Sequence, residues 1–228
     1  MIIPGIFEDN QEGVLKLLTM LAGVAKVVQL DIADGLFVPR KTFTDLGFLS
    51  GHNPQTTIQL HLMVQKPEAY SMFLPKEITD VCAHAESFIY RPLCLGEYYD
   101  LLKSKGKRRG ICFNPDTGFE EFAQVIKQCD YVQLMSVYPG DQGKAFLAST
   151  LTKVRGFKKS FPDTPIQLDG GIALDNVQTA VEVGANSLVV GSRIAKSPDP
   201  VKAYTEFVLK FDHARRDFYT SSQPNLHH

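Results

Sequence analysis

Short apolar segments alternate with amphipathic segments along the whole chain. The apolar segments predict eight strands, at residues 2–6, 27–32, 56–64, 80–85, 110–113, 131–137, 165–168 and 187–190. The segments between them carry helical periodicity, at residues 14–24, 95–104, 119–128, 175–183 and 198–211, with further helices opening at Pro67 and ending near Ser160. Because these connections are too long for hairpins, the pattern favours a parallel sheet.

The number of strand-helix units indicates how the sheet is built. Eight units within 228 residues fit a single (β/α)8 TIM barrel that occupies residues 1–228 as one domain. An open, doubly wound sheet is the alternative, because the pattern alone does not show whether the first and last strands meet.

Composition narrows the possible partners. The chain has 24 basic and 25 acidic side chains, so it lacks the basic field that nucleic acid or an anionic membrane surface attracts. Its four cysteines are scattered singly, which fits neither a zinc ribbon nor a disulfide framework. No apolar run approaches membrane-spanning length. We therefore expect a soluble, cytoplasmic protein that binds neither nucleic acid nor membrane.

The second predicted strand ends in an acidic residue. Val28, Leu30 and Ile32 are apolar, whereas Gln29 and Asp31 alternate with them and share the other face of the strand. A buried aspartate costs several kcal/mol unless it is paired, hydrogen-bonded or bound to a metal. A turn that donates hydrogen bonds to Asp31 is the structural explanation, and a functional site is the other.

Two more polar residues occupy corresponding positions on other predicted strands. His61 lies in the third strand and Asp169 ends the seventh, so a closed barrel would bring both to the same rim as Asp31. Taken singly, His61 would fit a hydrogen-bonded core histidine. Together, two carboxylates and an imidazole match a site for one divalent metal ion with room for a substrate oxygen.

Glycines follow the last strands of the predicted barrel. Gly170 and Gly171 come after the seventh strand, and Gly191-Ser192 after the eighth, where backbone N–H groups can hold a phosphate. A tight turn alone would also explain the paired glycines. Gly140 and Gly143, after the sixth strand, predict a mobile lid over the same region.

Seven short segments carry a family resemblance that runs in order over nearly the whole chain. They are Leu-Asp-Ile-Ala-Asp-Gly-Leu-Phe-Val-Pro at 30–39, His-Leu-Met-Val followed by Pro-Glu at 61–68, His-Ala-Glu at 84–86, Gly-Ile-Cys-Phe-Asn-Pro at 110–115, Met-Ser-Val-Tyr-Pro-Gly at 135–140, Asp-Gly-Gly-Ile at 169–172 and Val-Val-Gly-Ser at 189–192. The chain resembles the ribulose-phosphate 3-epimerase family in these segments.

That resemblance implies a (β/α)8 barrel, a divalent metal ion (zinc, iron or manganese) and inversion at C3 of a ketose phosphate such as ribulose 5-phosphate. It implies that Asp31 and Asp169 are both acid/base residues and metal ligands, and that His61 is a third ligand. It further implies a homo-oligomer and a set of pocket and phosphate-binding residues: Met63, Met135, Gly140, Gly170, Gly171, Gly191 and Ser192. Two carboxylates suit this reaction, because the C3 proton is acidic beside the C2 carbonyl and must leave one face and return to the other.

The chain departs from the family pattern around the expected site. Gln29 replaces the histidine that usually supplies the fourth ligand, and an amide oxygen is a poorer donor to zinc or iron(II). Gly5 replaces a serine and Ala33 a methionine of the pocket. Asp141 replaces an aromatic residue in the lid, where Lys144 is the expected compensating charge.

These departures leave other functions open. A catalytically impaired sugar-phosphate-binding protein that keeps the barrel and the phosphate loops is the main alternative. A decarboxylase or aldolase of related phosphate-binding barrels is disfavoured, because such enzymes typically carry Asp-x-Lys-x-x-Asp, and Ala33 and Leu36 stand where this motif requires lysine and aspartate.

Overall fold

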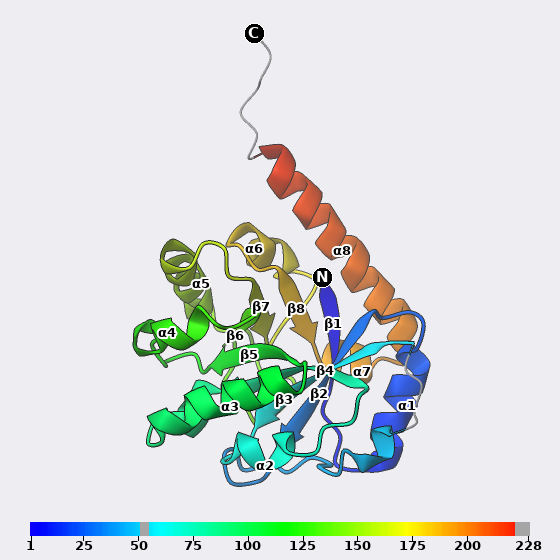
Figure 1. The fold of residues 1–228 in the computed structure, drawn as a ribbon. Helices are drawn as coiled ribbons and strands as arrows, with labels where there is room; N and C mark the ends of the chain where they lie inside the picture. The colour runs from blue at the N-terminus through cyan, green and yellow to red at the C-terminus, as the bar shows by residue number, and fades with distance from the viewer. Residues whose placement is uncertain (51–54, 222–228) are drawn as a thin grey trace.

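The strands of the protein close into a parallel barrel. The computed structural model describes residues 1–50 and 55–221, and within them eight strands are hydrogen-bonded in sequence order (Figure 1). The ring is completed by β1 and β8, where Ile3 is paired with Val189. The strands are β1 (Ile2–Ile6), β2 (Val27–Ala33), β3 (Thr57–Met63), β4 (Ile78–His84), β5 (Arg108–Phe113), β6 (Tyr131–Met135), β7 (Ile166–Asp169) and β8 (Ser187–Val190). The predicted barrel is confirmed, and the open sheet is excluded.

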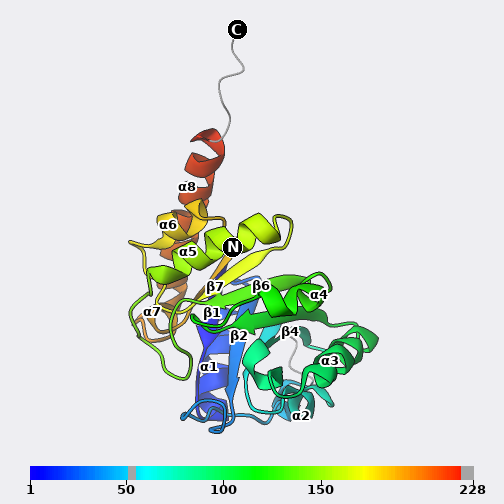
Figure 2. The same ribbon diagram turned by 90° about the vertical axis from the view of Figure 1, so that its left-hand side faces the viewer.

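Helices surround the barrel, as Figures 1 and 2 show from two directions. They are α1 (Gln11–Leu21), α2 (Pro67–Ser71), α3 (Pro92–Ser104), α4 (Ala123–Ile126), α5 (Ser149–Ser160), α6 (Val177–Glu182), α7 (Ser192–Ala195) and α8 (Pro200–Ser221), with 3-10 turns η1 (Gly47–Leu49), η2 (Ala85–Phe88) and η3 (Glu120–Phe122). The helix expected at 119–128 is divided between η3 and α4, and α7 was not predicted. The last helix continues well past residue 211 and extends away from the barrel (Figure 2).

Helix α1 illustrates how the sequence specifies these elements. Asn10 caps it, because its side-chain oxygen accepts a hydrogen bond from the backbone N–H of Gly13 at 2.8 Å. Val14, Leu17 and Leu21 are buried at helical spacing and form one apolar face against the barrel. Each such side chain contributes roughly 1.5–3 kcal/mol when it is fully buried.

A three-residue pattern recurs in four of the strands. Each has glutamine, then leucine, then a residue that lines the central cavity: Gln29-Leu30-Asp31, Gln59-Leu60-His61, Gln133-Leu134-Met135 and Gln167-Leu168-Asp169. The leucines belong to the main hydrophobic core, whereas the glutamines hydrogen-bond to one another inside the barrel. Since side chains alternate along a strand, the residue after each leucine points inward like the glutamine, one layer nearer the strand's carboxyl end.

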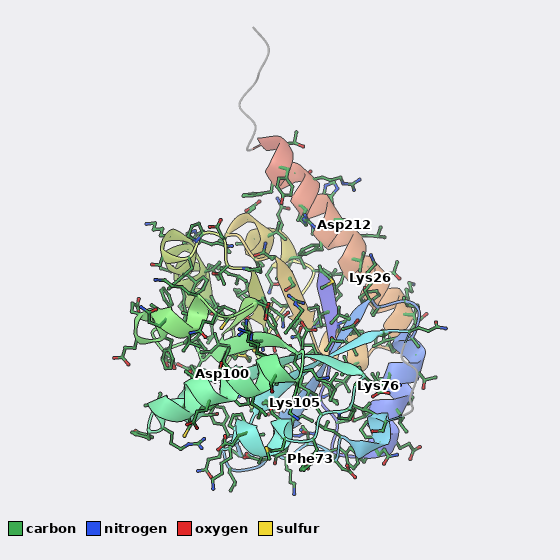
Figure 3. All side chains as sticks on the ribbon, in the orientation of Figure 1. Lys26, Phe73, Lys76, Asp100, Lys105 and Asp212 are labelled. Atoms are coloured by element: carbon green, nitrogen blue, oxygen red, sulfur yellow. The ribbon has the colours of Figure 1, made fainter. Side chains whose placement is uncertain are left out.

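The outer surface carries charges of both signs. Figure 3 labels Asp100 and Lys105 on the α3 side of the molecule, and Lys26 and Asp212 near α8. No helix in residues 1–50 and 55–221 combines the length and apolar character needed to cross a membrane.

Candidate active site

The carboxyl ends of the strands hold the predicted site residues around one cavity. In the β2–β3 register Asp31 lies opposite His61, and in the β6–β7 register Met135 lies opposite Asp169. All four residues, together with Met63, line a cavity of about 420 Å³. The structure therefore brings together residues from distant parts of the sequence.

Asp31, His61 and Asp169 converge closely. His61 Nδ1 lies 3.0 Å from Asp31 Oδ1 and 3.4 Å from Asp169 Oδ2. One ligand atom from each residue lies within 4.8 Å of the other two, so this group could hold a metal ion. Carboxylate oxygen and imidazole nitrogen are donors that zinc, iron and manganese accept.

His61 is oriented by a chain of polar contacts behind it. Its Nε2 lies 2.9 Å from His84 Nε2, and His84 Nδ1 lies 3.2 Å from Glu86 Oε2. Burial, together with the charge of His61, lowers the pKa of His84 despite the hydrogen bond to Glu86. Burial alone would lower the pKa of His61, but Asp31 and Asp169 outweigh it and raise that pKa. His84 is thus the neutral partner that accepts a hydrogen bond from His61.

Gln29 lies in the middle of this group. Its Nε2 lies 2.8 Å from Asp31 Oδ1, 2.7 Å from Asp169 Oδ2 and 3.4 Å from His61 Nδ1. These four side chains therefore fit a divalent cation only in part: Asp31, His61 and Asp169 offer ligand atoms, whereas Gln29 presents N–H donors. A role for Gln29 as a metal ligand stays a prediction.

The two carboxylates lie in unequal surroundings. Burial and the charge of Asp31 raise the pKa of Asp169 to about 7, although His61 and the hydrogen bond from Gln29 oppose the rise. Asp169 can therefore hold or release a proton near neutral pH, as a general acid or base requires.

Glycine-rich loops also line the cavity. Gly140, Gly170, Gly171, Gly191 and Ser192, the residues expected to bind a phosphate, all line it. Gly170 and Gly171 have φ values of 107° and 65°, a region that L side chains rarely adopt. A Cβ at residue 171 would lie 2.5 Å from the backbone nitrogen of Phe146. Both the conformation and the close packing of this loop therefore require glycine.

The two charged residues of the lid, Asp141 and Lys144, have different partners. Asp141 lies 3.8 Å from Arg40 Nη1, whereas Lys144 Nζ donates to the backbone oxygen of Tyr138 at 3.0 Å. Arg40 is thus an ion-pair partner of Asp141 that the sequence did not indicate, and Lys144 lines the same cavity as Asp141. At another departure, a Cβ at Gly5 would lie 3.1 Å from Val189 Cγ1, so a serine has little room there.

Sequence reasoning missed residues that surround the predicted set. Phe7 and Arg193 line the cavity, and Gln133 Nε2 donates to Asp169 Oδ2 at 2.8 Å. The glutamines of the four-strand pattern carried a detectable signal, since a polar residue precedes each cavity residue by two positions on strands that are otherwise apolar. Phe7 and Arg193 had no comparable signal.

Together, the closed barrel, the two convergent carboxylates and the glycine loops define a (β/α)8 protein with a candidate active site at the carboxyl ends of its strands. A model of the "Ribulose-phosphate 3 epimerase family" matches residues 2–195. Ribulose-phosphate 3-epimerase of Bacillus subtilis (strain 168) is 33% identical over 192 residues, which cover 81% of this chain and 86% of the relative. The enzyme of the same name from Escherichia coli (strain K12) is 32% identical over 196 residues, covering 82% and 84%. The chain belongs to the ribulose-phosphate 3-epimerase family.

Solved structures agree on the fold. KGPDC from Streptococcus mutans superposes with a TM-score of 0.71 at 10% identity, covering 93% of this chain and 97% of the other. At this level of identity the likeness concerns the fold alone.

Proposed function

We propose that the protein is an isomerase that inverts C3 of a ketose phosphate, with ribulose 5-phosphate and xylulose 5-phosphate as the first substrates to examine. The observation that carries the proposal is the convergence of Asp31 and Asp169, from β2 and β7, on one cavity that also holds the glycine loops. Membership of the family supports the same reaction.

The two aspartates suit a two-base proton transfer. The C3 hydrogen lies beside the C2 carbonyl, so a carboxylate can remove it as a proton and leave an enediolate. The other carboxyl, protonated, then returns a proton to the opposite face of C3, and the configuration inverts. Within this chain His61 and Gln29 hold the two carboxyl groups in place. A divalent metal ion (zinc, iron or manganese), when bound, would supply Lewis-acid stabilisation of the enediolate.

Other lining residues are suited to different parts of the proposed substrate. The backbone around Gly170, Gly171, Gly191 and Ser192 is suited to the phosphate, because these residues have no side chain or a small one and so leave the backbone N–H groups accessible from the cavity. Met63 and Met135 would pack against the carbon chain. The Arg40 guanidinium reduces the repulsion between Asp141 and an incoming anion.

Proton exchange tests the reaction directly. In deuterated water, wild-type protein should replace the C3 hydrogen of ribulose 5-phosphate by deuterium as xylulose 5-phosphate forms, which proton NMR detects. Asp31→Asn and Asp169→Asn should each lower the rate by roughly 10²–10⁴-fold, the usual contribution of a general acid or base. Unchanged turnover in either variant would show that the acid/base assignment is wrong.

A catalytically impaired sugar-phosphate-binding protein is the second candidate. Gln29 favours it, since its amide presents N–H donors where the family pattern places a ligand. Such a protein would bind ribulose 5-phosphate in calorimetry but exchange no C3 hydrogen with any metal added. The family resemblance also supports a homo-oligomer acting in the cytoplasm, and light scattering of the purified protein would measure its oligomeric state.

A further inference from the structure

The Gln29 side chain is held at both ends. Its amino end contacts both carboxylates, Asp31 and Asp169, as described above. Its Oε1 accepts hydrogen bonds from Gln59 Nε2 at 2.9 Å and from Gln167 Nε2 at 3.0 Å. If the amide turned over, its N–H groups would face those of Gln59 and Gln167, and its oxygen would face two carboxylates.

The direction of this amide is set by a longer chain of hydrogen bonds. Gln133 Nε2 donates to Asp169 Oδ2 at 2.8 Å, so Gln133 Oε1 is left to accept from Gln167 Nε2, also at 2.8 Å. The same Gln167 nitrogen donates to Gln29 Oε1. Because one oxygen of Asp169, Oδ2, accepts from the amino groups of both Gln133 and Gln29, it sets the orientation of Gln133, which sets that of Gln167 and then that of Gln29. We call Gln133, Gln167 and Gln29 the amide relay.

The amide relay is shielded from water. The exposed fractions of Gln29, Gln133 and Gln167 are 0%, 0% and 2%. A donor or acceptor buried away from bulk water costs about 1–3 kcal/mol when it loses its partner. The amides therefore resist turning over one at a time.

We propose that the Gln29 amino group, fixed by the amide relay, takes the place of a cation between Asp31, His61 and Asp169. A divalent cation that binds this site must then displace the Gln29 amino group, which the hydrogen bonds of the amide relay oppose. The amide hydrogens reduce the repulsion between the two carboxylates but carry no full charge. A cation that approaches the three ligand atoms meets the N–H groups of Gln29, and it gains a fourth ligand only if the amides reverse. The chain thus binds divalent cations more weakly than its three convergent ligands would allow.

Direct metal titration tests this proposal. Chelator-stripped protein is titrated with Co²⁺, followed by visible absorption, and with Zn²⁺, followed by calorimetry, in the absence of any sugar phosphate. Gln29→His should bind Co²⁺ about 10–100-fold more tightly than wild type, since a donor hydrogen is replaced by a ligand nitrogen. Gln29→Leu removes the amide and should also bind Co²⁺ more tightly than wild type. If the Gln29 oxygen were instead a metal ligand, this substitution would weaken Co²⁺ binding.

A second position in the amide relay gives an independent result. Gln167→Leu leaves Asp31, His61, Asp169 and Gln29 unchanged but removes a donor that holds Gln29 Oε1, so Co²⁺ affinity should rise about tenfold. Ser187→Ala is the matched control: it removes only the Ser187 Oγ hydrogen bond to Gln167 Oε1, and wild-type affinity is expected.

The outcomes are separable from the proposed function, because no step of the titration requires epimerisation. Wild-type affinity equal to that of Gln29→His would overturn the proposal, as would weaker binding in Gln29→Leu. Should Gln29→Leu fail to fold, Gln167→Leu decides, and unchanged or weaker Co²⁺ binding in that variant overturns the proposal.

Discussion

His61 and His84 face each other through their Nε2 atoms, 2.9 Å apart. The ionised Glu86 carboxylate can only accept, so its 3.2 Å contact with His84 Nδ1 places a hydrogen on that nitrogen. A neutral His84 then accepts at Nε2, and His61 must donate from its own Nε2. His61 Nδ1 is therefore directed at Asp31 and Asp169. A buried positioning residue, His84, thus determines which nitrogen of His61 faces the cavity.

Replacement of His84 should affect catalysis through the orientation of His61. His84→Leu is expected to lower kcat by roughly 10–100-fold with a smaller change in KM, because it removes a hydrogen-bond partner behind the site. His84→Gln retains an acceptor oxygen and should recover part of the loss. Phe37→Leu is the control, since it alters the ring packed 4.8 Å from His84 and leaves the hydrogen bond in place. Equal losses in the Leu and Gln variants would contradict a positioning role.

Two glycine substitutions should change stability in opposite directions. Gly171→Ala introduces a Cβ 2.5 Å from the backbone nitrogen of Phe146, at a residue whose φ is 65°, so the loop must move. We expect this substitution to destabilise the protein by about 1–3 kcal/mol and to raise KM. Gly156→Ala lies within α5, where a Cβ meets nothing within 4 Å, and should stabilise the protein by about 0.5–1 kcal/mol. Urea unfolding of both variants measures these differences. Equal changes in the free energy of unfolding for the two substitutions would show that crowding at Gly171 does not determine the stability of Gly171→Ala.

The sequence predicted the barrel, and it predicted most of the residues that converge on the cavity, because both depend on local pattern. Asp31 and Asp169 are recognisable as acids at the ends of apolar strands, and eight strand-helix units favour the barrel, whose closure the β1–β8 pairing shows. The orientation of Gln29 was not predictable in this way. It depends on Gln133 and Gln167, which are distant in the sequence, and on which end of each amide faces Asp169.

The lid shows the same limit for surface charges. Lys144 is close to Asp141 in the sequence and is the charge expected to compensate it near a phosphate, and its ammonium group donates to the backbone oxygen of Tyr138. Arg40, which follows β2, is the side chain that reaches Asp141. Pairing between loops depends on how the loops fold over the barrel, and spacing along the chain does not report it.

Removal of Arg40 should weaken binding of an anionic substrate. The pair with Asp141 is exposed, so its contribution to stability is only about 0–1 kcal/mol, but without it Asp141 repels a phosphate at the cavity. Arg40→Ala is expected to raise KM several-fold at low ionic strength, and the rise should diminish with added salt. Adding Asp141→Asn to Arg40→Ala should restore most of the affinity. If the double variant is no better than Arg40→Ala, Arg40 acts on the substrate by another route.

Glu86 should make the fold sensitive to acid. Burial alone would raise the pKa of Glu86, but hydrogen bonds from His84, Thr117 and the Asn114 N–H outweigh it and lower that pKa to about 2. A carboxyl whose pKa is lower in the folded than in the unfolded protein stabilises the fold above the unfolded value, near 4.5, and this contribution is lost as the pH falls toward 2. The contribution is up to about 3 kcal/mol.

Glu86→Gln measures this contribution, because glutamine keeps the size of the side chain and does not titrate. Urea unfolding at a series of pH values should show wild type more stable than the variant above about pH 5, with the difference decreasing steadily below about pH 4.5. Asp116→Asn, at an exposed position bonded to Tyr138, is the control and should follow the wild-type profile. A constant difference between wild type and Glu86→Gln over the whole range would mean that Glu86 stabilises the fold by its shape and neutral hydrogen bonds rather than by its charge.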